Sequence, residues 1–147
     1  MKADKTKAYI LVSMQFICLI LIFASGRPMA TNYLLLALEI MGCALGGWAI
    51  VTMGRQNLNI TPLAKQGAQL VTWGPYRFIR HPMYSALLLT IWPLIIDRFS
   101  LFLVITGLVL TLVLIVKLFF EEIFLKRHFA EYADYMKTTK RLIPYIF

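Results

Sequence analysis

Four apolar runs, each with few or no charged residues, constrain this chain more than any other feature of its sequence. A helix needs roughly 20 apolar residues to cross the hydrocarbon core of a bilayer. The runs cover about residues 8–25, 32–53, 82–96 and 99–120, and the third is barely long enough to cross. We therefore expect an all-α, polytopic membrane protein with four transmembrane helices, in which residues 1–147 form one membrane domain.

Composition supports a location in the bilayer. Of the 147 residues, 60% are hydrophobic, and the mean hydropathy of +0.73 is well above that of soluble proteins. The first run follows three lysines and ends near the small residues "ASG" at 24–26, as a cleaved signal peptide would. It is longer than the usual apolar region of such a peptide, so we expect a retained membrane anchor.

The basic residues predict the orientation in the membrane, because cytoplasmic loops carry an excess of lysine and arginine. There are 15 such residues, and all but Arg27 and Arg98 fall in three regions. These regions are the N-terminus before the first run, the loop between the second and third runs, which includes Lys65, and the segment from Lys117 onward. Both termini and the long middle loop should therefore be cytoplasmic. The net charge of +8 then reflects topology and attraction to anionic lipid headgroups, and we expect no nucleic-acid partner.

The first polar segment, residues 73–84, precedes the third run and reads "WGPYRFIRHPMY". Glycine and proline mark a turn, and Pro82 suits the first position of a helix. The backbone N–H groups of residues 83–85 would then be unpaired and would attract an anion. Arg77 and Arg80 would strengthen that preference. The alternative is that both arginines only extend to lipid headgroups, and the spacing does not decide between the two.

The second polar segment, residues 121–144, opens with Glu121 and Glu122. Adjacent helical side chains point about 100° apart, so these two carboxylates cannot both face one ligand squarely. Each also has a local partner of opposite charge, Lys117 for Glu121 and Lys126 for Glu122. Structural ion pairs therefore remain an alternative to a functional role. The following amphipathic helix presents aromatic residues that favour packing.

Together, the two segments resemble a known family of membrane enzymes. "GPYRFIRHPMY", followed by a hydrophobic hairpin and "EEIFLKRHFAEYADYMKTTKRLIP", is similar to the C-terminal core of the isoprenylcysteine carboxyl methyltransferase and phospholipid methyltransferase families. The similarity runs from about residue 74 to residue 144. It implies methylation of a lipidic or prenylated acceptor, at a carboxylate or an amine, with S-adenosyl-L-methionine as cofactor and S-adenosyl-L-homocysteine as product. No metal is needed for such a transfer.

The resemblance also implies site residues in cytoplasmic elements at 73–84 and 121–144. The tail would fold back as a lid over the adenine side of the cofactor. The expected cofactor-binding residues are Tyr76, His81, Pro82, Met83, Tyr84, Glu121, Glu122, Tyr132, Arg141 and Pro144. The expected catalytic residues, which would clamp or activate the acceptor, are Arg77, Arg80 and Glu121.

Other functions stay open at this point. Membrane sterol reductases carry a similar R-H-P-x-Y element and use NADPH, and a scaffold without activity could keep the same fold. The short chain and the paired glutamates favour the methyltransferase. Glu39 lies inside the second run, where a carboxylate is a candidate functional group, or else forms a hydrogen bond between helices. The small residues "GCALGG" at 42–47 suit close helix packing within one chain or between two, so the oligomeric state is undetermined.

Overall fold

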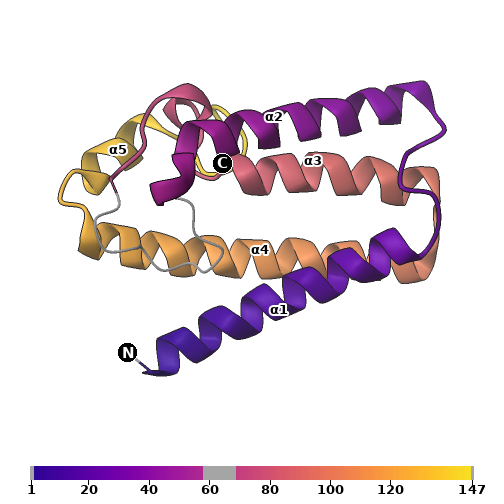
Figure 1. The fold of residues 1–147 in the computed structure, drawn as a ribbon, viewed down its shortest axis with the longest axis horizontal. Helices are drawn as coiled ribbons and strands as arrows, with labels where there is room; N and C mark the ends of the chain where they lie inside the picture. Colours follow the sequence, from indigo (N-terminus) through magenta and orange to yellow (C-terminus); the bar gives the residue numbers. More distant parts are fainter. Residues whose placement is uncertain (1, 58–68, 147) are drawn as a thin grey trace.

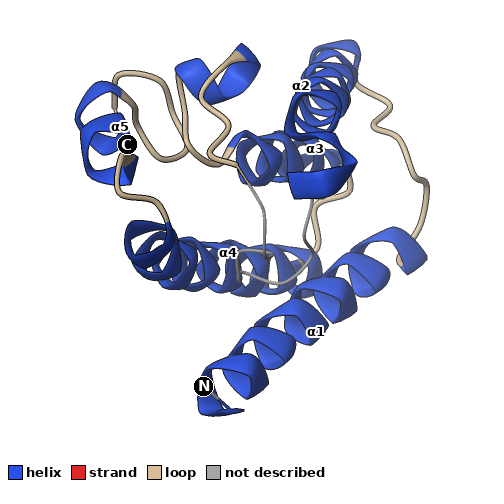
Figure 2. Ribbon diagram, turned by 60° about the vertical axis from the view of Figure 1, so that its left-hand side comes forward, coloured by secondary structure: helices blue, strands red, loops and turns tan. Residues whose placement is uncertain are grey.

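The computed structural model describes residues 2–57 and 69–146, and Lys65 lies outside this range. The described chain is helical, and its one β-type contact is an isolated parallel bridge between Ile79 and Lys140. Figure 1 shows the order of the elements and Figure 2 their helical character. They are α1 (Lys2–Ala24), α2 (Tyr33–Asn57), the short 3₁₀ helix η1 (Gly74–Arg77), α3 (Pro82–Asp97), α4 (Leu101–His128) and α5 (Tyr132–Thr138).

The predicted all-α membrane architecture is confirmed. Three segments, Lys5–Ala24, Tyr33–Arg55 and Leu101–His128, are long and apolar enough to cross a membrane. The remaining apolar helix, α3, has only 16 residues and is the short third run of the sequence. α4 does not end where its apolar run ends but continues to His128, so the paired glutamates are carried on the same rigid helix.

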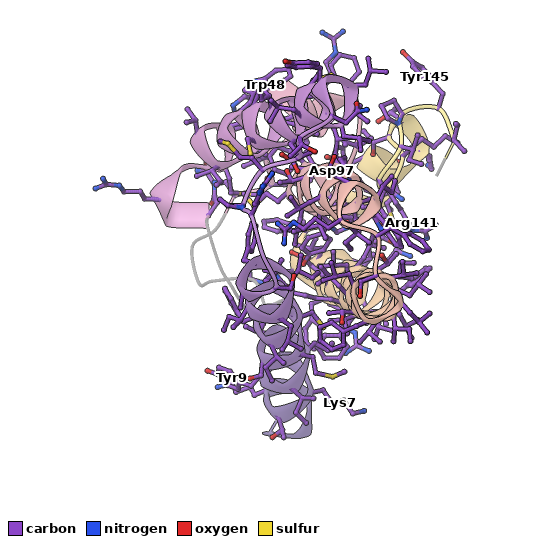
Figure 3. All side chains as sticks on the ribbon, turned by 90° about the vertical axis from the view of Figure 1, so that its right-hand side faces the viewer. Lys7, Tyr9, Trp48, Asp97, Arg141 and Tyr145 are labelled. Atoms are coloured by element: carbon purple, nitrogen blue, oxygen red, sulfur yellow. The ribbon has the colours of Figure 1, made fainter. Side chains whose placement is uncertain are left out.

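The helices lie in two main pairings. α2 packs along α3, and α1 packs against α4, while α3 also contacts α4. Figure 3 shows Lys7 and Tyr9 on the part of α1 that extends away from the other helices. The buried apolar residues of the largest cluster come from α1, α3 and α4: Cys18, Ile22, Ile91, Leu94, Ile95, Leu103, Leu110 and Leu114. The outward faces of these helices are exposed Leu, Ile and Phe, as expected for surfaces that meet lipid.

Polar contacts join the helices at the end where α1 connects to α2 and α3 to α4. The Asp97 carboxylate accepts hydrogen bonds from the backbone N–H groups of Thr31, at 2.9 Å, and Asn32, at 3.1 Å. The buried Glu39 accepts one from the Ala30 N–H at 3.1 Å. Glu39 thus contacts the α1–α2 connection. In Figure 1 this connection lies at the opposite end of the bundle from the C-terminal end of α4, which carries the paired glutamates.

Gly42 makes the close contact between α2 and α3 possible. A Cβ atom at this position would lie 2.9 Å from both the Ala86 carbonyl oxygen and the Thr90 backbone nitrogen, and it would also meet the Thr90 hydroxyl. Gly47, on the same helix, has nothing within 4 Å of its Cβ position. We expect Gly42→Ala to lower the stability of the protein by about 1–3 kcal/mol, because α2 and α3 must move apart.

Thermal unfolding of the detergent-purified protein tests this expectation, with Gly47→Ala as the matched control. Gly47→Ala should leave the Tm unchanged or slightly raised, since alanine is the better helix former. Equal Tm values for the two variants would contradict the close α2–α3 packing.

Candidate functional site

The loop that enters α3 is held against α2 by a glycine. Gly74 has a φ of +61°, a backbone conformation that favours glycine. A Cβ atom there would lie 2.7 Å from the Thr52 hydroxyl oxygen of α2. Gly74 is the first residue of η1 and Pro75 the second, and both Pro75 and Tyr76 are buried. The predicted turn therefore forms, and it directs the Tyr76 side chain into the protein.

The C-terminal tail lies beside this loop, although about 60 residues separate them in sequence. The Arg80 N–H donates to the Lys140 carbonyl at 2.7 Å, and the His81 N–H donates to the Arg141 carbonyl at 3.0 Å. The Ser85 hydroxyl adds a bond to the Leu142 carbonyl at 2.6 Å. Figure 1 shows the yellow tail returning to the start of α3. The two polar segments thus form one cluster at one end of the bundle.

Arg80 joins the loop before α3 to α4 and to the C-terminal tail. Its Nε donates to Glu122 Oε1 at 2.8 Å, and its Nη1 donates to the carbonyl oxygens of Thr139 and, at 3.3 Å, Met136. Arg141 Nε donates to the other carboxylate oxygen, Glu122 Oε2, at 3.2 Å. Both oxygens of the buried Glu122 are therefore bonded to cations of the loop and the tail.

The local ion pairs considered from the sequence do not form. Within the described residues, Glu122 has no bond to Lys126 and Glu121 has none to Lys117 within 4 Å. The reason is that Glu122 points inward, toward Arg80, while Lys126 is exposed on the outer face of α4. Long-range partners thus replace the neighbours four residues away.

Glu121 belongs to a second group with His81 and Tyr84. The rings of His81 and Tyr84 stack in parallel with centroids 5.4 Å apart. The Tyr84 hydroxyl donates to Glu121 Oε2 at 2.8 Å, and His81 Nδ1 lies 3.7 Å from the same oxygen. His81 Nε2 lies 3.7 Å from Glu122 Oε1, beyond hydrogen-bond distance. The paired glutamates therefore differ in role. Both carboxylate oxygens of Glu122 accept hydrogen bonds, whereas Oε1 of Glu121 accepts none within the described chain.

Three buried polar atoms in this cluster have no hydrogen-bond partner among the described residues: the hydroxyl oxygens of Tyr76 and Tyr132, and His81 Nε2. Burial, together with the nearby Glu121 carboxylate, raises the pKa of Tyr76 well above its usual range. Burial and the Glu122 carboxylate do the same to the pKa of Tyr132. Both phenols thus stay protonated at neutral pH and can donate a hydrogen bond to a ligand.

The start of α3 differs from the prediction in one respect. Pro82 is the first helical residue, as expected, with His81 before it. The N–H groups of Tyr84 and Ser85 are not free, however, because they bond to the His81 carbonyl at 3.0 and 3.1 Å. We expected the N–H groups of residues 83–85 to be unpaired and available to an anion. This expectation is wrong for two of them, because they donate to the carbonyl of His81, the N-cap residue of α3.

The expected site residues do not all lie together. Pro82 follows His81 at the start of α3, and Met83 packs against the apolar group that includes Tyr76, whereas Arg77 is exposed on η1. Pro144 is also exposed, and it lines an apolar cavity of about 580 Å³ instead of the polar cluster. Other residues that line this cavity are Leu45, Trp48, Phe78, Leu88, Leu89 and Ile143.

Sequence reasoning missed two residues that hold the site together. Tyr135 donates its hydroxyl proton to the Tyr76 carbonyl at 2.6 Å, which fixes η1 against α5. Thr139 accepts from Arg80 through its carbonyl and donates its hydroxyl to the Tyr135 carbonyl at 2.6 Å. The aromatic pattern of the tail indicated packing for Tyr135, and no sequence pattern indicated Thr139.

The sequence also matches a family of known proteins. The sequence model of the family described as phospholipid methyltransferase matches residues 30–132, well over half of the chain. The match includes α2, η1, α3, α4 and the first residue of α5, and so it covers most of the cluster. No curated protein matches the chain significantly.

Proposed function

This chain belongs to the phospholipid methyltransferase family of integral membrane enzymes, and from that premise we propose that it transfers a methyl group from S-adenosylmethionine to a lipidic acceptor. The family supports a membrane methyltransferase that acts on lipid. The cofactor, the acceptor group and the residues that bind them are our proposals.

The observation that carries the proposal is the set of buried polar atoms without partners. Burying such a group costs free energy unless a ligand completes its hydrogen bonds. These atoms are the hydroxyls of Tyr76 and Tyr132 and the Nε2 of His81. The half-buried Glu121 carboxylate lies 3.7 Å from His81 Nδ1 and acts electrostatically on both phenols. A ligand that fits them must offer both donors and acceptors. S-adenosylmethionine does so through its ammonium, carboxylate, ribose hydroxyls and adenine.

The structure changes the roles that we assign to the two glutamates. Glu121 would accept hydrogen bonds from the cofactor's ammonium or ribose hydroxyls, since charge-assisted bonds are the stronger kind. His81 and Tyr84 would complete this side of the pocket, and Tyr76 and Tyr132 would donate to its acceptors. Glu122, Arg80 and Arg141 would act as positioning residues that hold the loop and tail around it.

Methyl transfer then requires alignment more than acid–base chemistry. When bound, S-adenosylmethionine supplies an electrophilic methyl group, and its transfer leaves S-adenosylhomocysteine. Holding two reactants in line contributes much of such a rate enhancement. We propose that both termini and the polar cluster face the cytoplasm, from which the soluble cofactor arrives. The acceptor, a lipid or prenylated molecule with a reactive carboxylate or amine, would reach the cluster from the bilayer.

Calorimetric titration of the detergent-purified protein tests this function. We expect saturable binding of S-adenosylhomocysteine and no binding of NADPH. Binding of NADPH without S-adenosylhomocysteine would overturn the proposal in favour of a reductase. Binding of neither would overturn it in favour of a scaffold without activity.

A further inference from the structure

Lys117 is a buried cation inside the membrane-spanning part of α4. Its exposed fraction is 4%, and it lies in the segment that is long and apolar enough to cross the membrane. Its Nζ donates to the side-chain oxygen of Gln15, on α1, at 2.8 Å. The same atom lies over the Tyr84 ring, 5.2 Å from its centroid. The ammonium group is thus enclosed by one amide and one aromatic face.

Neither partner carries a negative charge, and the Glu121 carboxylate acts on Lys117 only from a distance, without a direct ion pair. Within the described residues, no carboxylate oxygen lies within 4 Å of Nζ. An ammonium group has three donors, and one hydrogen bond is made. Removing an ion from water is costly without a counter-ion, and an ionisable residue at membrane depth commonly marks a functional site. The unused donors of this ammonium group and the lack of a direct ion pair therefore point to an anionic ligand.

The position of Lys117 connects it with the proposed cofactor pocket. Tyr84, over which Nζ lies, bonds through its hydroxyl to Glu121. Lys117 and Glu121 are one helical turn apart on α4, with Lys117 nearer the apolar part of the helix. Glu121 in turn lies next to His81. A continuous polar chain thus runs from the loop and tail toward the membrane and ends at Gln15 and Lys117.

We propose that Lys117, together with Gln15 and Tyr84, binds the anionic group of the lipidic acceptor, either a phosphate or a carboxylate. This inference rests on the proposed function, because it names the substrate class of that same site. Lys117 supplies the charge, Gln15 keeps its NH₂ group as a further donor, and Tyr84 links the anion-binding group to Glu121. The alternative is that Lys117 only attaches α1 to α4.

Native mass spectrometry of the full-length protein in detergent tests the proposal with two pairs of probes. Phosphatidic acid and diacylglycerol differ by a phosphate, and S-farnesylcysteine and its methyl ester differ by a free carboxylate. We expect the protein to retain the anionic member of one pair at least about tenfold better than the neutral member. The pair that shows this preference identifies the acceptor's anion as phosphate or carboxylate.

The variants assign the preference to Lys117. Lys117→Met should abolish the preference for the anionic lipid, and Lys117→Arg should retain it. Lys126 is an exposed lysine on the same helix, so Lys126→Met should behave as wild type. If Lys117→Met does not fold, Lys117→Gln removes the same charge and keeps a hydrogen-bonding group for Gln15. A preference that survives loss of the charge, or no preference in either pair, would overturn the proposal.

Titration of the same samples with S-adenosylhomocysteine separates this inference from the proposed function. We expect Lys117→Met to bind it as wild type does, since Lys117 is assigned to the acceptor. If the wild-type protein selects the anionic lipid but does not bind S-adenosylhomocysteine, the proposed methyltransferase function is wrong and the proposed anion site at Lys117 still holds. If it binds S-adenosylhomocysteine but shows no preference for the anionic lipid, only the proposed anion site is wrong.

Discussion

Arg80→Met is expected to release the C-terminal tail and to lower the free energy of unfolding by about 3 kcal/mol, because it leaves a buried carboxylate without one of its cations. The Arg80 and Glu122 side chains are only 5% and 4% exposed, and 2.8 Å separates Nε from Oε1. Arg80 also donates to the Thr139 carbonyl, which fixes the tail. Denaturation by SDS in mixed micelles measures the loss of stability. Trypsin cleavage at Lys137 and Lys140 measures release of the tail.

Two further variants show whether the ion pair causes the effect. Arg77→Met removes an exposed arginine from the same loop and should change neither readout. The double variant Arg80→Met, Glu122→Met removes both buried charges, and it should recover much of the stability because apolar side chains can replace a buried pair. If the double variant is as unstable as the sum of the two single variants, the pair does not act as a unit.

The membrane fold could be predicted because its signals are local. A span needs only a run of apolar residues, and the start of α3 at Pro82 follows from the missing N–H of proline. The pairing of loop and tail could not be derived in this way. The bond between the Arg80 N–H and the Lys140 carbonyl joins backbone groups, which carry no side-chain signature. The similarity to a known family indicated that the two segments belong together, but not how they pair.

The roles of single charges were harder to predict than the site itself. The sequence does not distinguish Arg77 from Arg80, yet one is exposed and the other is buried against Glu122. The rule for neighbours four residues apart favoured Lys126 for Glu122, and the tertiary fold supplied Arg80 and Arg141 instead. The helical angle between adjacent residues is consistent with different hydrogen-bond donors for the two carboxylates, Tyr84 for Glu121 and Arg80 for Glu122. His81 nevertheless lies 3.7 Å from both.

That difference gives the sharpest test of the cofactor pocket. Glu121→Gln is expected to weaken binding of S-adenosylhomocysteine by about 10- to 100-fold, the range for losing a hydrogen bond to a charged group. It should leave the Tm nearly unchanged, because the amide oxygen can still accept from the Tyr84 hydroxyl and the side chain is 29% exposed. Calorimetric titration measures the affinity.

Glu131→Gln is the matched control, because it makes the same chemical change at an exposed position next to α5 and should bind like wild type. His81→Ala should weaken binding as Glu121→Gln does, since it removes the unpartnered Nε2 from the same cluster. The two losses should be less than additive, because His81 Nδ1 and Glu121 Oε2 lie 3.7 Å apart and would contact one ligand. Wild-type affinity in both variants would mean that the cofactor binds elsewhere, and the unpartnered atoms of Tyr76 and Tyr132 would then need another explanation.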